Sequence, residues 1–300
     1  MTAYLLVVSC FVAGILLQTN GVLRDRLTAT LNNFAIYIAL PAIILAKVPQ
    51  LNLAPSAIFV VISAWMSMAL SCLIIVPLGR KLGWEREVII VCVVLTGLGN
   101  TAFLGMAMIK LLFNDELLGF AVLYDQFGSF LLLSFLLPLV LALKGAAGNH
   151  TSLLTIGKNI LFFPPFVSLI IALAVPISPI TEFLKLPLEW LTLSLLPLSM
   201  LIVGMQFQLK IAKNHRVPIA LSLTTKMLLI PALVAITGIS FGIPKEIFQA
   251  TVVQSAMPPM VTPAVFLISL NLLPRLAASI LSLGTLLSFV TIPTIAFLLN

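Results

Sequence analysis

The stretch Thr96-Gly97-Leu98-Gly99-Asn100-Thr101-Ala102-Phe103-Leu104-Gly105 lies in the middle of a long apolar segment, residues 88–113. Glycine exposes the backbone and weakens a helix, and lipid contains no water that could satisfy a freed peptide group. One explanation is a membrane helix that is broken at Gly97 and Gly99, with its loose N–H and C=O groups facing a substrate cavity. The alternative is a face of small residues that packs against another helix.

The composition around this stretch is that of a membrane protein. The chain has 300 residues, of which 61% are hydrophobic and 8% are charged, and its mean hydropathy is +1.22. A balance this apolar excludes an ordinary soluble domain. The net charge of +7 matches anionic lipid headgroups, and nothing in the sequence indicates a nucleic-acid partner.

Ten apolar segments approach or exceed the roughly 20 residues that a helix needs to cross a bilayer. We therefore predict an all-α membrane protein with ten transmembrane helices in a single domain, residues 1–300. The predicted spans are 3–20, 29–46, 55–77, 88–113, 117–143, 157–177, 187–207, 217–240, 247–270 and 276–299.

Basic residues are concentrated in every second loop. The odd-numbered loops contain eleven: Arg24, Arg26, Arg80, Lys81, Arg86, Lys144, Lys158, Lys210, Lys213, Arg216 and Arg275. The even-numbered loops contain four: Lys47, Lys110, Lys185 and Lys245. Because Lys and Arg favour cytoplasmic loops, we predict that the odd loops are cytoplasmic and that both termini lie outside.

The two halves of the chain share an internal repeat. Leu82–Glu87 leads into the fourth predicted span, and Phe241–Glu246 leads into the ninth with the same pattern of Gly, a basic residue and Glu. When these two stretches are aligned, Asn100 falls on Pro259. Interrupted segments at matching places in two halves are typical of a transporter site near the membrane midplane.

Prolines support the same division. Pro41 and Pro197 are predicted to break the second and the seventh span, in the same order in both halves. Five spans per half is an odd number, so the second half must be inverted in the membrane. We predict inverted five-helix repeats over about 1–143 and 157–300, joined by a polar linker at 144–155.

At this point the chain resembles the auxin efflux carrier family, in its bacterial branch, over its whole length. The resemblance rests on Asn33-Phe-Ala-Ile-Tyr-Ile-Ala-Leu-Pro41, Gly99–Gly105, Tyr124-Asp125-Gln126 and Met257-Pro258-Pro259. It implies a ten-span carrier in the bacterial cytoplasmic (inner) membrane, in which broken helices 4 and 9 cross at their midpoints. It also implies organic anions as substrates, such as auxin in plants and malate or malonate in bacteria.

The wider fold of that family is similar to the fold of bile-acid/sodium symporters, which carry acidic and amide sodium ligands near the crossing. The ninth predicted span has no carboxylate between Phe248 and Leu270. We therefore predict no metal site, and no cofactor is expected.

Two full charges, Asp125 and Lys226, lie well inside predicted spans. Ionisable groups at such depth are costly and usually face a cavity or a partner. Because burial disfavours the charged carboxylate, Asp125 could take up and release a proton and couple transport to a gradient. The alternative for both residues is a structural ion pair or a hydrogen-bonded buried group.

Polar groups at the two expected breaks would contact the substrate. A carboxylate suits the N-terminus of a half-helix, where free N–H groups and the helix dipole point at it. Hydrogen bonding between helices is the rival role, above all for Gln254. The predicted substrate-binding residues are Asn100, Thr101, Gln254, Ser255, Pro258, Pro259 and Lys226.

Enzyme motifs are missing from the sequence, and both histidines, His150 and His215, fall in loops. We therefore predict a secondary active transporter of small organic anions that works by alternating access and is linked to protons. The alternatives are a sodium-coupled organic-anion symporter of the bile-acid type and a non-transporting membrane receptor or scaffold. The predicted partners are the anion, the lipid bilayer and protons, and a homodimer stays open.

Overall fold

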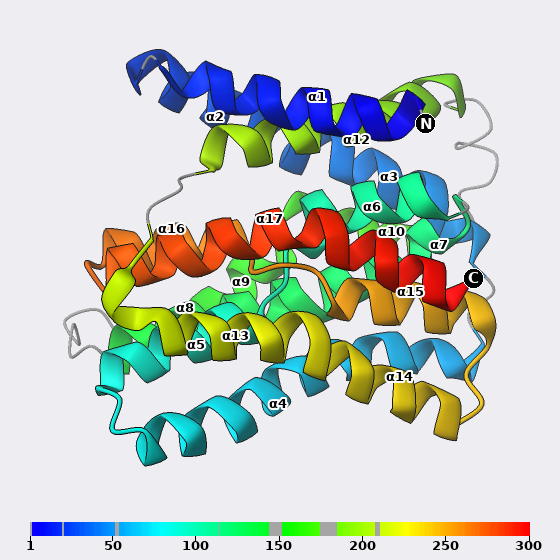
Figure 1. Cartoon of the computed structure of the whole chain (residues 1–300). Helices are drawn as coiled ribbons and strands as arrows, with labels where there is room; N and C mark the ends of the chain where they lie inside the picture. The colour runs from blue at the N-terminus through cyan, green and yellow to red at the C-terminus, as the bar shows by residue number, and fades with distance from the viewer. Residues whose placement is uncertain are drawn as a thin grey trace. The chain divides into compact units, whose positions relative to one another are not determined.

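The structure is a computed structural model that describes residues 2–19, 21–51, 54–113, 115–143, 152–174, 185–207 and 211–300. Within these ranges the chain is all-helical, and its extended pairing is one isolated bridge between Gly99 and Pro259. Most of the predicted linker, residues 144–151, lies outside the described residues. The chain divides into two compact units. Figure 1 labels their helices.

Unit 1 comprises Met1–Ala54, Ala102–Val122 and Lys158–Phe207. Its α-helices are α1 (Thr2–Leu16), α2 (Gly21–Phe34), α3 (Leu40–Lys47), α6 (Met106–Leu112), α10 (Pro164–Ala174) and α12 (Lys185–Gln206). Its other helices are the short 3-10 turns η1 (Leu17–Thr19) and η3 (Val48–Gln50) and the π-helical η2 (Ala35–Ala39). The helices η5 (Thr101–Gly105), α7 (Leu117–Leu123) and α9 (Leu153–Leu161) run across a boundary between the units.

Unit 2 comprises Pro55–Thr101, Leu123–Gly157 and Gln208–Asn300. Its α-helices are α4 (Ile58–Lys81), α5 (Arg86–Gly97), α8 (Leu131–Leu143), α13 (Arg216–Thr224), α14 (Ile230–Ser240), α15 (Lys245–Ser255), α16 (Val261–Ser269) and α17 (Pro274–Leu299). Its π-helical segments are η6 (Tyr124–Phe130) and η8 (Thr225–Leu229), and its 3-10 turns are η4 (Pro55–Ala57) and η7 (Lys213–His215).

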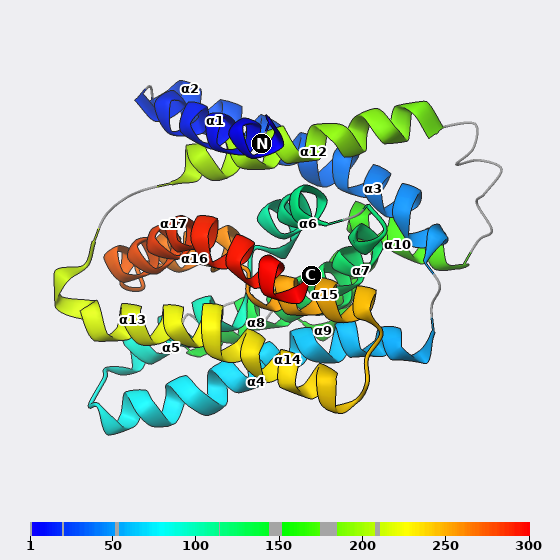
Figure 2. The ribbon, with the colours of Figure 1, turned by 45° about the vertical axis from the view of Figure 1, so that its right-hand side comes forward.

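In unit 1, α12 is the central helix and contacts α1, α2, α3 and α6. Its contact with α1 is the closest, because Gly14 and Gly204 let the two backbones meet (Figure 2). A Cβ atom on Gly204 would lie 2.2 Å from the carbonyl oxygen of Phe11. Gln18 strengthens the pair by donating its side-chain amide to the Gly204 oxygen at 2.6 Å. Small residues at a helix interface are typical of membrane proteins.

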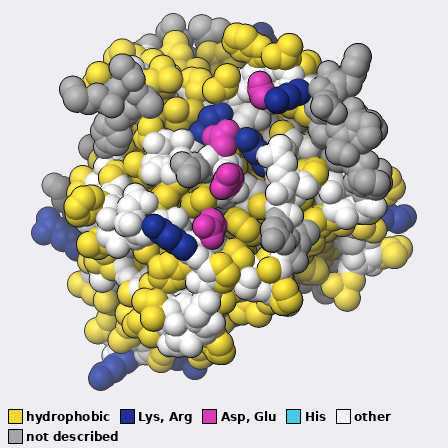
Figure 3. All heavy atoms as spheres, turned by 90° about the vertical axis from the view of Figure 1, so that its right-hand side faces the viewer, with side chains coloured by type: hydrophobic (Ala, Val, Ile, Leu, Met, Phe, Trp, Pro, Cys, Tyr) yellow, Lys and Arg dark blue, Asp and Glu magenta, His cyan; other side chains and the backbone are white. Residues whose placement is uncertain are grey.

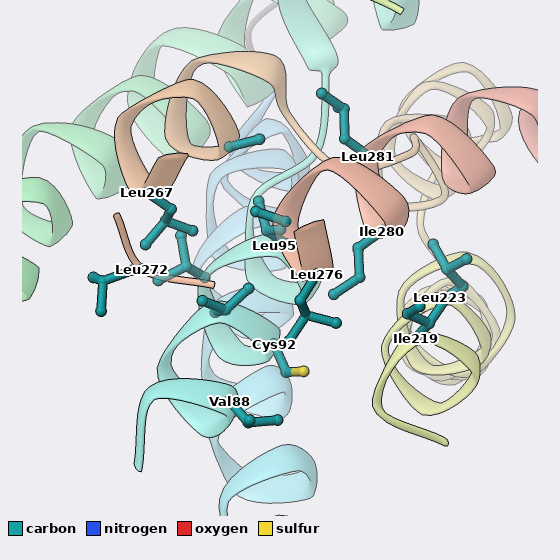
Figure 4. Close-up of a cluster of buried hydrophobic side chains, with 14 of the residues drawn as sticks. Val88, Cys92, Leu95, Ile219, Leu223, Leu267, Leu272, Leu276, Ile280 and Leu281 are labelled. Atoms are coloured by element: carbon teal, nitrogen blue, oxygen red, sulfur yellow. The ribbon is translucent and has the colours of Figure 1, made fainter. Parts of the chain in front are cut away.

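In unit 2, the core lies where α5, α13, α16 and α17 meet. Buried aliphatic side chains from these helices, among them Leu95, Leu223, Leu267 and Ile280, point toward one another in Figure 4. The side chain of Cys92 belongs to the same cluster. This core holds the half-helix α5 in place although α5 is too short to cross a membrane by itself.

The surface suits a lipid environment. Large apolar side chains are well exposed, including Phe297 at 82% and Ile239 at 71%. The face shown in Figure 3 is largely hydrophobic, with a few acidic and basic side chains grouped on it. By length and composition, six of the described helices can cross a membrane, or seven if the bent pair α9 and α10 is one span.

The other predicted spans are not continuous long helices in the described residues. The fourth and the ninth are each interrupted, and the described part of the first ends as an α-helix at Leu16. The sixth bends by 66° between Leu161 and Pro164. The number of uninterrupted helices is therefore smaller than the ten apolar segments.

The predicted breaks at Pro41 and Pro197 were wrong. α12 continues through Pro197, and Pro41 falls in the first turn of α3, directly after π-helical η2. A proline removes one N–H donor and crowds one carbonyl. In the first turn of α3 the missing N–H costs little, and α12 packs against α1, α3 and α6.

Candidate functional site

Two helix breaks meet in unit 2. α5 ends at Gly97 and is followed by extended Leu98, whereas α15 ends at Ser255 and is followed by a turn at Ala256. The Asn100 N–H donates to the Pro258 carbonyl oxygen at 2.8 Å, and the Met260 N–H donates to the Leu98 oxygen at 3.0 Å. We call this paired segment, residues 98–100 and 258–260, the bridge. Each break thus satisfies peptide groups of the other, which lipid cannot do.

The sequence explains why the ninth predicted span opens at this point. Pro258 and Pro259 have no N–H to donate to the preceding turn of α15. A proline also disfavours helical geometry in the residue before it, here Met257 and Pro258. The Pro259 ring then packs against α17, where a Cβ atom on Gly284 would lie 2.6 Å from Pro259 Cδ. The break is a packed and fixed feature.

The first break depends on glycine for a different reason. A Cβ atom on Gly97 would clash with Met68 Cε of α4. A Cβ atom on Gly99 would lie 3.1 Å from Lys226 Nζ. The two glycines therefore allow a neighbouring helix and a buried ammonium group to approach the backbone at the break.

Lys226 places its amino group beside the bridge. Its side chain is 1% exposed, and it lies in π-helical η8, a geometry that is frequent at functional sites. Within the described part of the chain, no hydrogen-bond acceptor and no carboxylate within 4.0 Å is recorded for its ammonium group. Asp125 and Lys226 therefore do not form an ion pair, which leaves a hydrogen-bonded buried group as the alternative to a functional role.

Asp125 has a separate set of partners. Thr101 Oγ1 donates to Asp125 Oδ1 at 2.5 Å, and Gln126 Nε2 donates to Asp125 Oδ2 at 2.8 Å. Ser129 Oγ lies 3.0 Å from Thr101 Oγ1. The carboxyl group is 3% exposed and, like Lys226, lies in a π-helical segment, η6. Thr101 thus links Asp125 to the first break.

One predicted residue of the second break, Gln254, joins this network. Gln254 Nε2 donates to the Thr101 carbonyl oxygen at 3.3 Å, so Gln254 connects α15 to the start of η5. Ser255 donates its hydroxyl to Val252 within its own helix at 2.7 Å. The side chains of Asn100, Gln254 and Ser255 are all buried. The structure therefore brings the predicted substrate-binding residues and Asp125 together around the bridge.

Sequence reasoning missed Ser129 and Ser67. Ser129 lies four residues after Asp125, on the same face of that helix, and this spacing could have identified it. Ser67 Oγ lies 3.1 Å from the Tyr124 hydroxyl and contributes a second polar contact between α4 and η6. No sequence signal marks Ser67, because serine is frequent in membrane helices.

Comparison with known proteins decides the family. The profile of a family described as membrane transport protein matches residues 1–296. The chain belongs to this family. This is the family of the auxin efflux carriers, so the resemblance of the four motifs is confirmed. Its members are transporters, in agreement with the prediction of a membrane transport protein and not an enzyme.

Two archaeal proteins are similar to the chain along most of its length. An "Uncharacterized transporter" of Methanothermobacter thermautotrophicus is 26% identical over 285 residues, 93% of this chain and 92% of the relative. A second uncharacterized transporter, from Methanocaldococcus jannaschii, is 26% identical over 223 residues, 71% of this chain and 70% of the relative. Family membership places the bridge, Lys226 and Asp125 inside a transporter.

Proposed function

We propose that the chain is a secondary active transporter of small organic anions, and that a substrate carboxylate binds at the bridge beside Lys226. The observation that carries the proposal is the buried Lys226 ammonium, which lies against the Gly99 backbone. A buried charge is costly unless something compensates it. No carboxylate of the described chain is recorded within 4.0 Å, so an anionic substrate would supply the missing charge.

The half-helices support an anionic substrate as well. η5 begins at Thr101 and α16 begins at Val261, directly after the two halves of the bridge. The N-terminus of a helix carries partial positive charge and favours a negatively charged group. Two such N-termini and one ammonium group favour a carboxylate over an amine or a neutral sugar.

For the membrane arrangement, we propose ten spans in two inverted five-helix repeats, of which the fourth and the ninth are the broken pair at the bridge. Both termini would lie outside, as the distribution of basic residues predicts. Alternating access would consist of a movement of one unit against the other. In the present conformation the residues around the bridge are buried, which fits a closed site.

Asp125 is the proposed coupling residue. Its carboxyl accepts hydrogen bonds from Thr101 and Gln126, and Thr101 belongs to the first break. Movement at the break would change these hydrogen bonds, and with them the preference of Asp125 for its protonated or ionised form. The mechanism therefore links a proton, rather than a sodium ion, to the passage of the anion.

One observation favours the sodium-coupled alternative. Thr101 Oγ1 lies within hydrogen-bond distance of both Asp125 Oδ1 and Ser129 Oγ, and a hard cation prefers oxygen ligands. Uptake of labelled carboxylates into proteoliposomes, with and without sodium, separates the possibilities. Uptake that needs no sodium supports the proton-linked carrier, and uptake that requires sodium supports the symporter. Specific binding without any uptake would indicate a receptor or scaffold.

A further inference from the structure

A second polar site lies in unit 1 and contains no residue of the bridge. It is a cavity of about 580 Å³ between the end of α3, the end of α6 and the start of α12. Three of the four lysines of the even-numbered loops line it: Lys47, Lys110 and Lys185. They lie far apart in the sequence and only the fold brings them together.

The charges that line this cavity are not balanced. Against the three lysines stand two carboxylates, Asp115 and Glu189. Asp115 is engaged already, because its Oδ2 lies 2.9 Å from Lys47 Nζ. The lining therefore keeps an excess of positive charge next to the paired residues.

After Lys47 and Asp115 are paired, Lys110 and Lys185 stand against the single carboxylate of Glu189. Lys110 Nζ donates to the Thr192 carbonyl oxygen at 2.9 Å and has no recorded carboxylate within 4.0 Å among the described residues. Lys185, at the start of α12, has no recorded hydrogen bond or ion pair in the same part of the chain. Lys110 is half-buried, so its ammonium has lost part of its water and gained only one carbonyl in return.

The remaining wall indicates what kind of anion would fit. Ala46, Leu188 and Leu193 contribute hydrocarbon surface, while Gln50 contributes an amide. An inorganic anion would leave the hydrocarbon wall without a partner. An organic carboxylate would place its charged end on the lysines and its carbon skeleton on the aliphatic side chains.

We propose that this cavity is a second binding site, which takes a small organic carboxylate on Lys110 and Lys185. The site does not depend on the transport mechanism proposed above, because the cavity and the bridge share no residue and belong to different units. Its ligand has the same chemistry as the proposed substrate, so it would hold an anion before or after passage, or as a separate effector.

The test is chemical footprinting of lysines on the purified full-length protein. Amine acetylation is quantified by mass spectrometry with succinate, with benzoate, and with chloride at matched ionic strength. Either carboxylate should slow modification of Lys110 and Lys185 several-fold and leave Lys81 and Lys245 unchanged. Equal protection by chloride would mean that any anion screens the lysines, and this would overturn a carboxylate site. Protection by neither carboxylate would also overturn it.

Three variants make the result specific. In Lys185→Gln, the carboxylate affinity measured from the protection of Lys110 should fall about tenfold, because a charged hydrogen-bond donor is lost. Lys245→Gln is the matched control: it removes the same charge from another even-numbered loop outside the cavity, and protection should persist. In Lys226→Met, which removes the charge at the bridge, protection of Lys185 should also persist. Loss of Lys185 protection in Lys226→Met would overturn an independent second site. Protection of Lys185 in a parent protein that shows no transport would refute only the proposed function.

Discussion

Replacing Lys226 with methionine tests whether the lysine serves to bind an anion or to stabilise the fold. Methionine has nearly the same length as lysine and no charge, so it can fill the same space beside Gly99. If the ammonium exists to bind an anion, the empty protein bears a cost that the substitution removes. Lys226→Met should therefore make the protein more stable and abolish carboxylate binding at the bridge.

The magnitude follows from the burial of the side chain. Lys226 is 1% exposed and no carboxylate is recorded within 4.0 Å in the described chain. A lysine at the centre of a membrane helix costs about 2.5–3.5 kcal/mol on insertion scales. Some of that cost is already relieved by nearby backbone dipoles, so we expect Lys226→Met to raise the free energy of unfolding by about 1–3 kcal/mol.

Two measurements on the same preparations test this prediction. Thermal unfolding of the purified protein should show a higher midpoint for Lys226→Met, while the control Lys81→Met, at an exposed helix end, should show no change. Equilibrium binding of labelled carboxylates should be lost in Lys226→Met alone. A variant that is less stable than the parent and still binds carboxylates would refute the reasoning, because Lys226 would then be a structural residue.

Three further substitutions test other parts of the account. Asp125→Asn keeps the Thr101 contact but cannot ionise, so transport should lose its pH dependence before carboxylate binding weakens. Uptake across a pH series measures this, and an unchanged pH dependence would argue against Asp125 as the coupling residue. Pro259→Ala removes the ring that packs on Gly284, which should destabilise the protein by about 1–2 kcal/mol and weaken carboxylate binding several-fold. Parental values in thermal unfolding and binding assays would show that the bridge does not need the Pro259 ring. Gly204→Leu forces a side chain into the Phe11 backbone and should destabilise unit 1 by about 3 kcal/mol or more; thermal unfolding like that of the parent would contradict the close α1–α12 contact.

The site could be predicted from the sequence because its signals are local and costly. Glycines at 97 and 99 and the consecutive prolines at 258 and 259 weaken a helix, and a freed peptide group is costly in a membrane span. Charges at Asp125 and Lys226 stand out for the same reason.

The rest depended on packing, which the sequence does not display. Pro41 and Pro197 look like breaks, yet neighbouring helices hold α12 and α3 helical around them. The cavity with Lys110 and Lys185 arises only when distant helix ends meet. The π-helical segments that carry Asp125 and Lys226 have no sequence signature of their own.

Counterflow in proteoliposomes tests the central claim most directly, because only a carrier that exposes one site alternately to both sides can show it. Vesicles loaded with an unlabelled carboxylate are diluted into the same compound in labelled form, without a sodium or proton gradient. The account predicts transient accumulation of label with the parent protein and with Lys245→Gln, and none with Lys226→Met. Counterflow that persists in Lys226→Met, or a parent protein that binds carboxylates without counterflow, would contradict it.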